Sequence, residues 1–229
     1  MVMSRPCLVI AALLSFFFKI CCSRIGIANL GNTCYLNSVI QSLYHADEFR
    51  DKLECRVVGG GDFDVSSALV SIFNQLDGEE VTANAKVLVQ LCKVNPFIQE
   101  DAQEFLLKLF EKIDDDSTAS NEKNGSPTDV FAGEMVQYIR CCNVNFTKER
   151  KTSFYDLSVD VVGADDLPQA LDNLFTPDLL EGDGQYKTAE HGLQDASKGQ
   201  CISKLPSVLY IHLKRFSYDF TTDKMRKVK

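Results

Sequence analysis

Apolar residues recur three or four positions apart in three stretches of the first half of the chain: residues 36–44, 65–76 and 102–113. This spacing places them on one face of a helix, so each stretch is predicted to form an amphipathic α-helix. A further helix is expected over residues 83–93, ending before Pro96. Asp101 precedes the last helix and Glu104 lies three residues after it, an arrangement that resembles a capping box.

The pattern changes after residue 113. Residues 114–129 hold one alanine and no larger apolar side chain, which predicts a solvated loop. This loop separates a helical first half from a second half with a different period.

In the second half, apolar and polar residues alternate over residues 155–161, as in a half-buried strand. Strands are also expected over residues 135–141 and 208–216, and Pro168 is placed to begin a short helix. Helices followed by strands predict an α+β fold.

Residues 7–18 form an apolar run, with Arg5 before it and Lys19 after it. The run is too short to span a bilayer but suits the core of a secretory signal, and Cys21 and Ser23 are small enough to precede a cleavage site. The alternative is an apolar leader without that function, such as an unusual first exon. The residues alone leave both interpretations open.

Composition limits the class of protein further. The chain has 229 residues, enough for one domain or two small ones, and its 45% of hydrophobic residues supports a buried core. The net charge of −8 argues against nucleic acid as the main partner, because phosphate binding needs a basic surface. The nine cysteines cannot all pair within one chain.

Cys34 is the strongest candidate for a chemical role. It falls at the first turn of the helix predicted over residues 36–44, where unpaired N–H groups and the helix dipole favour a thiolate. Gly31 allows close backbone approach, and Asn29 could donate its amide to a developing oxyanion. The alternative is a small cysteine packed as a modest hydrophobe.

A cysteine nucleophile usually works with a histidine, and the chain has three. His45 lies eleven residues along the same predicted helix, roughly 16 Å from Cys34 at about 1.5 Å per residue. His191 follows a polar loop and is expected to be exposed, and His212 fits a structural position within a strand. The residues therefore offer a nucleophile without a base.

Three segments, in this order, resemble the motifs of the ubiquitin-specific proteases, the papain-like deubiquitinases. They are residues 26–38 (GIANLGNTCYLNS), residues 99–106 (QEDAQEFL), and residues 205–209 (LPSVL) with 212–216 (HLKRF). The herpesvirus-associated branch of the family is similar in a further set: residues 131–141 (FAGEMVQYIRC), 184–187 (GQYK) and 190–196 (EHGLQDA).

The resemblance implies a papain-like hand fold with a helical thumb over about residues 25–115 and β-rich fingers and palm over about 130–229, after a leader over 1–24. It implies that Cys34 is the nucleophile and that Asn29 stabilises the oxyanion. Ubiquitin and ubiquitinated proteins are the implied partners.

Asp101 and Glu104 are the implied contacts of the arginine-rich ubiquitin tail, to which acidic residues are suited. Both residues also have a simpler explanation as helix caps and as compensation of the helix dipole, an effect of about 1 kcal/mol.

The sequence departs from the family pattern at two places. Cys141 and Cys142 are adjacent where many members carry Cys-x-x-Cys pairs, so we expect no metal and no cofactor. The family's catalytic histidine follows the third motif, and the chain stops at Lys229. We therefore expect a C-terminally incomplete domain, truncated before the last palm strands.

Two functions remain open: a deubiquitinating cysteine protease that acts through a Cys34 thioester, and a truncated, inactive ubiquitin-binding fragment. A secreted disulfide protein is a third, weaker alternative. The resemblance implies a location in the cytoplasm and nucleus, where thiols stay reduced, while the leader leaves secretory entry open. No membrane span is expected, and the oligomeric state is not indicated.

Overall fold

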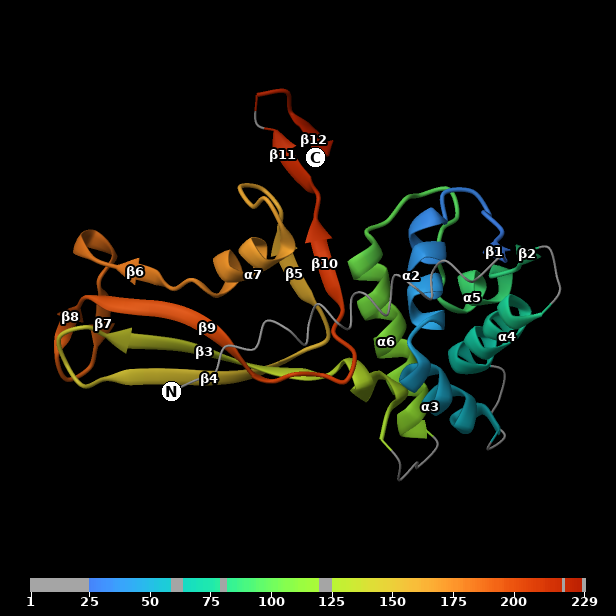
Figure 1. Cartoon of the computed structure of the whole chain (residues 1–229), viewed down its shortest axis with the longest axis horizontal. Helices are drawn as coiled ribbons and strands as arrows, with labels where there is room; N and C mark the ends of the chain where they lie inside the picture. The colour runs from blue at the N-terminus through green and yellow to red at the C-terminus, as the bar shows by residue number, and fades with distance from the viewer. Residues whose placement is uncertain (1–24, 59–63, 79–81, 120–124, 220, 228–229) are drawn as a thin grey trace. The chain divides into compact units, whose positions relative to one another are not determined.

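The computed structural model describes residues 25–58, 64–78, 82–119, 125–219 and 221–227 (Figure 1). The chain divides into two compact units, Met1–Asp129 and Val130–Lys229. The apolar leader over residues 1–24 lies outside the described residues.

The described part of the first unit is mainly helical. Its elements are β1 (Gly26–Ile27), α2 (Cys34–Tyr44), α3 (Asp47–Val58), α4 (Val65–Asp77), β2 (Thr82–Ala83), α5 (Lys86–Leu91) and α6 (Ala102–Ala119), and the 3₁₀ helix η1 (Pro127–Phe131) leads into the second unit. Strands β1 and β2 pair in parallel, with Gly26 opposite Thr82 and Ile27 opposite Ala83. Helix α2 packs against α3 and α6, and α4 packs against α3, α5 and α6.

The helices predicted from apolar spacing are confirmed as α2, α4 and α6. Their apolar faces form the core of the first unit, whose fully buried side chains include Leu36, Ile40, Leu43, Leu69, Phe73, Phe105, Leu106 and Phe110. Asp64 begins α4 with a capping box: its carboxylate accepts from Ser67 N at 2.8 Å, and the Ser67 hydroxyl accepts from Asp64 N at 2.9 Å.

Three parts of the first unit differ from the sequence prediction. The helix expected over residues 83–93 is shorter, because Ala83 pairs in β2 and only Lys86–Leu91 is helical. The expected loop over 114–129 is wrong at its start, because α6 continues to Ala119. Its second half is tied to α6 by Thr128, whose buried hydroxyl donates to Asp114 Oδ1 at 2.6 Å.

The described part of the second unit is mainly β-structure. Its elements are β3 (Gly133–Cys141), β4 (Thr147–Phe154), β5 (Leu157–Asp160), α7 (Leu167–Phe175), β6 (Asp178–Leu180), η2 (Gly182–Gly184), β7 (Tyr186–Thr188), β8 (Gly192–Gln194), β9 (Ala196–Lys204), β10 (Ile211–Lys214), β11 (Phe216–Asp219) and β12 (Lys224–Lys227). The largest sheet is antiparallel, in the order β4-β3-β9-β6. Strands β5 and β10 pair in parallel, whereas β7–β8 and β11–β12 are hairpins.

A second hydrophobic core lies under α7. It contains Met135 from β3, Leu157 and Val159 from β5, and Ala170 from α7. The strands predicted over 135–141 and 155–161 are therefore confirmed in kind, and the helix begun near Pro168 is α7.

The strand expected over residues 208–216 is shorter than predicted. Val208 and Tyr210 make single backbone bonds instead of a ladder, Val208 N to Val130 O at 2.9 Å and Leu157 N to Tyr210 O at 2.9 Å. The parallel ladder with β5 covers Ile211–Lys214, and Phe216 already begins β11.

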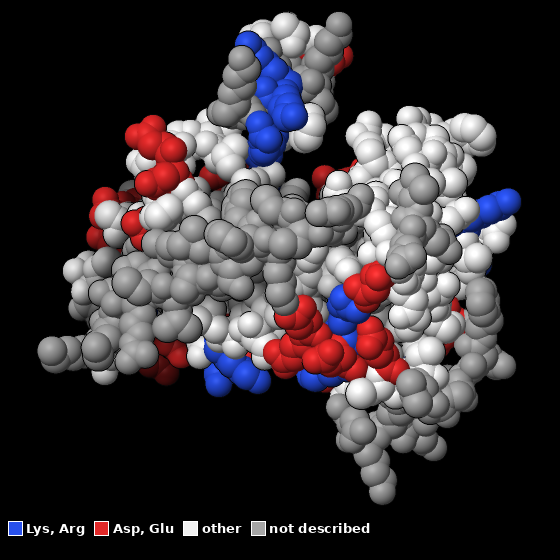
Figure 2. All heavy atoms as spheres, turned by 45° about the vertical axis from the view of Figure 1, so that its right-hand side comes forward, with Lys and Arg blue, Asp and Glu red and all other residues white. Residues whose placement is uncertain are grey.

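Side chains of both charges are spread over the face shown in Figure 2. Basic side chains gather near the β11–β12 hairpin (Figure 2). Lys214 and Arg215 precede β11, and Arg226 and Lys227 end β12. None of the described helices is both long and apolar enough to cross a membrane. The six cysteines within the described ranges form no disulfide bonds.

Candidate active site

Cys34 is the first residue of α2, and its side chain is exposed. The next residues of the helix, Tyr35 and Leu36, are buried and anchor this end of α2 in the core. The thiol therefore stands at the N-terminal end of a firmly packed helix, where free N–H groups and the helix dipole favour negative charge. The sequence predicted this position of Cys34.

The loop before Cys34 is closed by the side chains of Asn29 and Thr33. Asn29 Oδ1 accepts hydrogen bonds from the backbone N–H of Thr33 at 3.3 Å and from its hydroxyl at 3.1 Å. The same hydroxyl accepts from Leu30 N at 3.1 Å. Thr33 is buried, with 1% of its surface exposed, so the loop is fixed directly beside the exposed thiol.

These bonds orient the Asn29 amide. Because Oδ1 faces Thr33, Nδ2 is the end of the amide that can serve another acceptor, and within the described ranges it has no hydrogen-bond partner. A neutral N–H donor on the loop that precedes an exposed thiol suits an oxyanion. The role predicted for Asn29 remains a prediction.

A second loop, residues 95–99, is fastened to the first. Asn32 donates its backbone N–H to Pro96 O at 2.7 Å and its side-chain amide to Phe97 O at 2.8 Å. Gly31, with φ of +135°, allows this approach, because a Cβ there would lie 2.4 Å from Pro96 O. The close approach expected at Gly31 is thus observed, and Pro96 is its partner.

The strand that leads into the active-site loop is held by α2. Asn37 Nδ2 donates to Ile27 O at 3.2 Å and to Ala28 O at 3.3 Å, and Gln41 Nε2 donates to Ile25 O at 3.2 Å. These amides bond to main-chain carbonyl groups of residues 25, 27 and 28. The segment 25–28 is consequently fixed on both sides.

Gln99 is a residue near the Cys34 thiol to which the sequence assigned no role. Its Nε2 lies 3.8 Å from Cys34 Sγ, a separation that permits an N–H···S hydrogen bond. The two residues are 65 positions apart in the chain. Gln99 stands in the second motif, but helical spacing and charge patterns give no sign of its contact with the thiol.

Asp101 and Glu104 lie at the start of α6, and both are exposed. Asp101 Oδ1 accepts from Gln103 N at 2.8 Å and from Glu104 N at 3.2 Å, so Asp101 caps the helix as predicted. Its second carboxylate oxygen has no bond to a described residue, which leaves it available to a ligand.

Glu104 has a different partner from the one that a capping box would give it. Its carboxylate lies 2.9 Å from Lys108 Nζ, and Glu100 lies 3.6 Å from the same ammonium group. The hydrogen bond from Lys108 to Glu104 raises the pKa of the lysine, and the two carboxylates together keep it charged. Lys108 thereby ties the segment before α6 to the helix.

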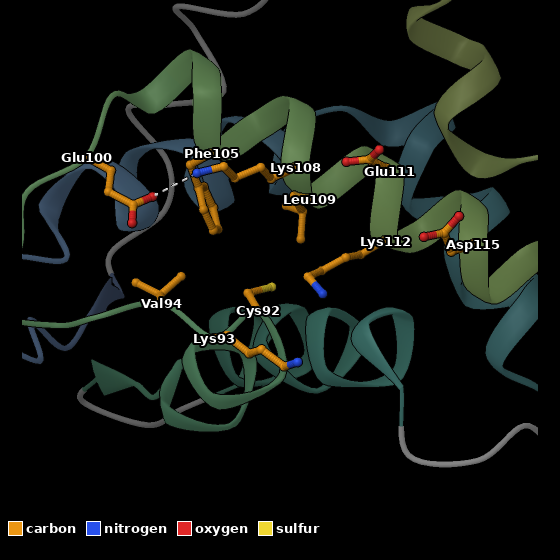
Figure 3. Close-up of a pocket in the computed structure, with 10 residues that line it drawn as sticks. All are labelled: Cys92, Lys93, Val94, Glu100, Phe105, Lys108, Leu109, Glu111, Lys112 and Asp115. Carbon is orange, nitrogen blue, oxygen red and sulfur yellow. Dashed lines mark ion pairs between the residues drawn. The ribbon is translucent and has the colours of Figure 1, made fainter.

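A cavity of ≈ 210 Å³ lies between α6 and the end of α5 (Figure 3). Its walls include Val94, Phe105 and Leu109, and Cys92 and Lys112 point into it. Cys34 does not line this cavity. Burial and the nearby Glu100 raise the pKa of Tyr35, whose buried hydroxyl has no hydrogen-bond partner within the described part of the chain.

The histidines lie where the sequence predicted. His45 caps the C-terminal end of α2, the end opposite Cys34. His191 is exposed, with 41% of its side-chain surface accessible, and His212 lies in β10 with Nδ1 3.2 Å from Ser158 Oγ. No group of three or more His, Cys, Asp or Glu side chains that could hold a metal occurs within the described ranges.

Comparison with known proteins finds a family model and several relatives that match most of the chain. The family model described as ubiquitin carboxyl-terminal hydrolase matches residues 25–229. Ubiquitin C-terminal hydrolase 12 of Arabidopsis thaliana is 38% identical over 210 residues, covering 89% of this chain and 19% of that protein. Ubiquitin carboxyl-terminal hydrolase 7 of Drosophila melanogaster is 32% identical over 204 residues, covering 87% of this chain and 18% of that protein.

A fungal relative gives the same result. Ubiquitin carboxyl-terminal hydrolase 15 of Saccharomyces cerevisiae is 33% identical over 210 residues, covering 89% of this chain and 17% of that protein. The chain thus spans less than a fifth of the length of these curated relatives. The α+β fold class predicted from the sequence, that of a papain-like domain, is confirmed. The matched residues 25–229 include β1, the Cys34 loop and the whole second unit, and the chain belongs to the ubiquitin carboxyl-terminal hydrolase family.

Proposed function

We propose that the protein is a deubiquitinating cysteine protease that hydrolyses isopeptide or peptide bonds after the C-terminal glycine of ubiquitin. The observation that carries this proposal is the exposed Cys34 thiol at the start of α2, beside a loop closed by Asn29 and Thr33. The partners are ubiquitin and ubiquitinated proteins, in the cytoplasm and nucleus.

The reaction is acyl transfer. The Cys34 thiolate attacks the carbonyl carbon of the scissile bond, and the charge that develops on the carbonyl oxygen is stabilised by the Asn29 amide. Collapse of the tetrahedral species expels the amine, which takes up a proton, and leaves ubiquitin as a thioester on Sγ. Attack of water then releases the ubiquitin carboxylate and restores the thiol.

The acidic start of α6 supports the choice of substrate. Asp101 is exposed and keeps one carboxylate oxygen unbound, so it can accept from an arginine of the ubiquitin tail. Glu104 already forms an ion pair with Lys108, so we propose that it contributes less than Asp101 to binding the ubiquitin tail. We also propose that the protein belongs to the herpesvirus-associated branch of the family, which residues 131–141, 184–187 and 190–196 resemble.

The test is reaction of the 229-residue chain with ubiquitin that carries a C-terminal electrophile. We expect a covalent adduct on Cys34, found by mass spectrometry, that Cys34→Ser abolishes. Hydrolysis of a ubiquitin fluorogenic amide then separates the two functions left open by the sequence, because a binding fragment would form the adduct without turnover. Absence of any adduct on folded protein would refute the proposed function.

A further inference from the structure

The Gln99 side-chain amide lies against the sulfur of Cys34, with Nε2 3.8 Å from Sγ. We propose that Gln99 holds the reactive thiolate in place by donating its amide N–H to Sγ. The inference rests on the proposed role of Cys34 as nucleophile. It adds Gln99 as a residue that contacts the reacting atom, Cys34 Sγ.

The position of Gln99 is set by contacts on both sides of it. Before it, Pro96 and Phe97 accept hydrogen bonds from Asn32 at 2.7 and 2.8 Å, so this segment cannot move away from the Cys34 loop without breaking both. After it, Asp101 caps α6 through two backbone N–H groups. Gln99 therefore lies between two backbone segments that hydrogen bonds hold in place, although its side chain is exposed.

The next residue adds a third constraint. Glu100 is half-buried and lies 3.6 Å from Lys108 Nζ on α6. Because Lys108 projects from the helix that follows, the ion pair ties the backbone beside Gln99 to α6. The contact between Gln99 and Cys34 therefore joins two backbone segments that are each held by other contacts.

The chemistry favours the thiolate over the thiol. A thiolate is a full acceptor, and an N–H bond to an ionised group is shorter and stronger than one to a neutral group. The separation of 3.8 Å is long for such a bond, and bonds of this kind tighten when charge develops in the reacting complex. An uncharged donor also stabilises the anion without pairing permanently with it.

The inference predicts the sign of three substitutions at Gln99. Gln99→Glu keeps the shape but replaces the donor with a carboxylate, so the thiol should ionise at higher pH. Gln99→Ala removes the donor without adding charge, and its effect should have the same sign but be smaller. Gln99→Lys supplies a charged donor of similar reach and should shift ionisation to lower pH.

The experiment measures alkylation of Cys34 by iodoacetamide in the 229-residue chain, from about pH 5 to about pH 10, a range that brackets an ordinary thiol. Trypsin releases residues 25–50, a peptide in which Cys34 is the sole cysteine, so its labelling can be followed separately. Gln90→Glu is the matched control, because Gln90 is an exposed glutamine of α5.

At neutral pH we expect labelling of Cys34 to slow about tenfold in Gln99→Glu and about threefold in Gln99→Ala. In both variants the profile of labelling rate against pH should move to higher pH. Gln99→Lys should displace the profile downward, and Gln90→Glu should follow the wild type. Profiles of all three Gln99 variants that superimpose on the wild type would overturn the inference. Thermal unfolding of each variant verifies that labelling reports on folded protein.

The result is independent of the proposed function, because iodoacetamide needs no ubiquitin. If the Gln99 profiles shift and the ubiquitin electrophile fails to react, the contact stands and the substrate assignment fails. If the electrophile reacts and the profiles do not shift, the substrate assignment stands and the role of Gln99 fails.

Discussion

A Cβ atom at Gly31 would lie 2.4 Å from the carbonyl oxygen of Pro96, a residue 65 positions later in the chain. The φ of Gly31 is +135°, in a region that side chains rarely adopt. The two loops that flank the Cys34 thiol can therefore meet only because residue 31 has no side chain.

The first prediction concerns this contact. Gly31→Ala should combine backbone strain with a clash against main-chain atoms, and we expect it to lower the free energy of unfolding by about 3 kcal/mol or more. It should also slow alkylation of Cys34, since Gln99 moves with the second loop. Chemical denaturation and peptide-resolved labelling measure the two effects.

Gly163→Ala is the control for Gly31→Ala. Gly163 has φ of +78°, and a Cβ there would meet no atom within 4 Å, so this variant reports backbone strain alone. We expect a loss of about 1 kcal/mol. Equal losses in the two variants would contradict the interpretation of the Gly31 contact.

The second prediction separates two roles of Asn29, the closing of the loop and the proposed stabilisation of the oxyanion. Asn29→Asp keeps the oxygen that accepts from Thr33 but loses the N–H proposed for the oxyanion. In a form of the protein with ubiquitin hydrolase activity, we expect kcat to fall about a hundredfold with little loss of stability. Asn29→Ala should lose stability as well, because the Thr33 N–H and hydroxyl lose their acceptor.

Steady-state hydrolysis of a ubiquitin fluorogenic amide and thermal unfolding test both Asn29 variants together. A normal kcat in Asn29→Asp would remove Asn29 from the catalytic machinery. The role of Asn29 would then be limited to closing the loop through its bonds to Thr33.

The third prediction distinguishes capping from substrate binding at Asp101. Asn is as good an N-cap as Asp, so Asp101→Asn should change stability by only a few tenths of a kcal/mol, whereas Asp101→Ala should cost about 1 kcal/mol. If the carboxylate also contacts a basic tail, Asp101→Asn should slow the reaction with the ubiquitin electrophile about tenfold.

Glu104→Gln is the comparison for Asp101→Asn, because it removes one negative charge from the same turn of α6. We expect a smaller effect on the electrophile reaction, since Glu104 is already bound to Lys108. Identical rates for wild type and Asp101→Asn would leave Asp101 with the capping role alone.

The fourth prediction concerns the pH dependence of stability. Asp77 accepts hydrogen bonds from the Tyr44 hydroxyl and from Arg50, the latter at 2.6 Å, which joins α2, α3 and α4. Burial raises the pKa of Asp77, but the bonds from Tyr44 and Arg50 outweigh it and bring the pKa below its ordinary value of 3.8. The stabilisation is therefore complete above pH 3.8 and is lost as the pH falls through the lower folded pKa.

Asp77→Asn should accordingly lower the free energy of unfolding by about 1 kcal/mol at neutral pH, a modest figure because the carboxylate is partly exposed to solvent. The difference from wild type should shrink when unfolding is measured near or below the folded pKa. Glu48→Gln, in a pair at 4.0 Å, should show little change at either pH. A constant difference across pH would argue against ionisation as its source.

The sequence predicted those parts of the fold whose signal is local. The apolar faces of α2, α4 and α6 repeat at helical spacing, and all three helices form. Helix α3 was not predicted, because charged residues dominate it and Phe49 and Leu53 are its deeply buried side chains. The extension of α6 beyond residue 113 was missed because that stretch is acidic and carries no apolar signal.

The site follows the same rule. The position of Cys34 at a helix start could be read from the residues around it, and so could the cap at Asp101. The contact of Gln99 with Cys34 could not, because it depends on Gly31, Asn32 and Pro96 bringing two distant loops together.

The two hydrogen bonds between Asn29 and Thr33 have a consequence for the proposed reaction of the Cys34 thiol with a substrate. An exposed residue on an ordinary loop would have to give up its conformational freedom at the moment of binding. Here the loop is ordered by Thr33, which is buried, so that entropy is lost when the chain folds. The Cys34 thiol is then exposed like a surface residue, while the loop that precedes it is held by a buried residue of the core.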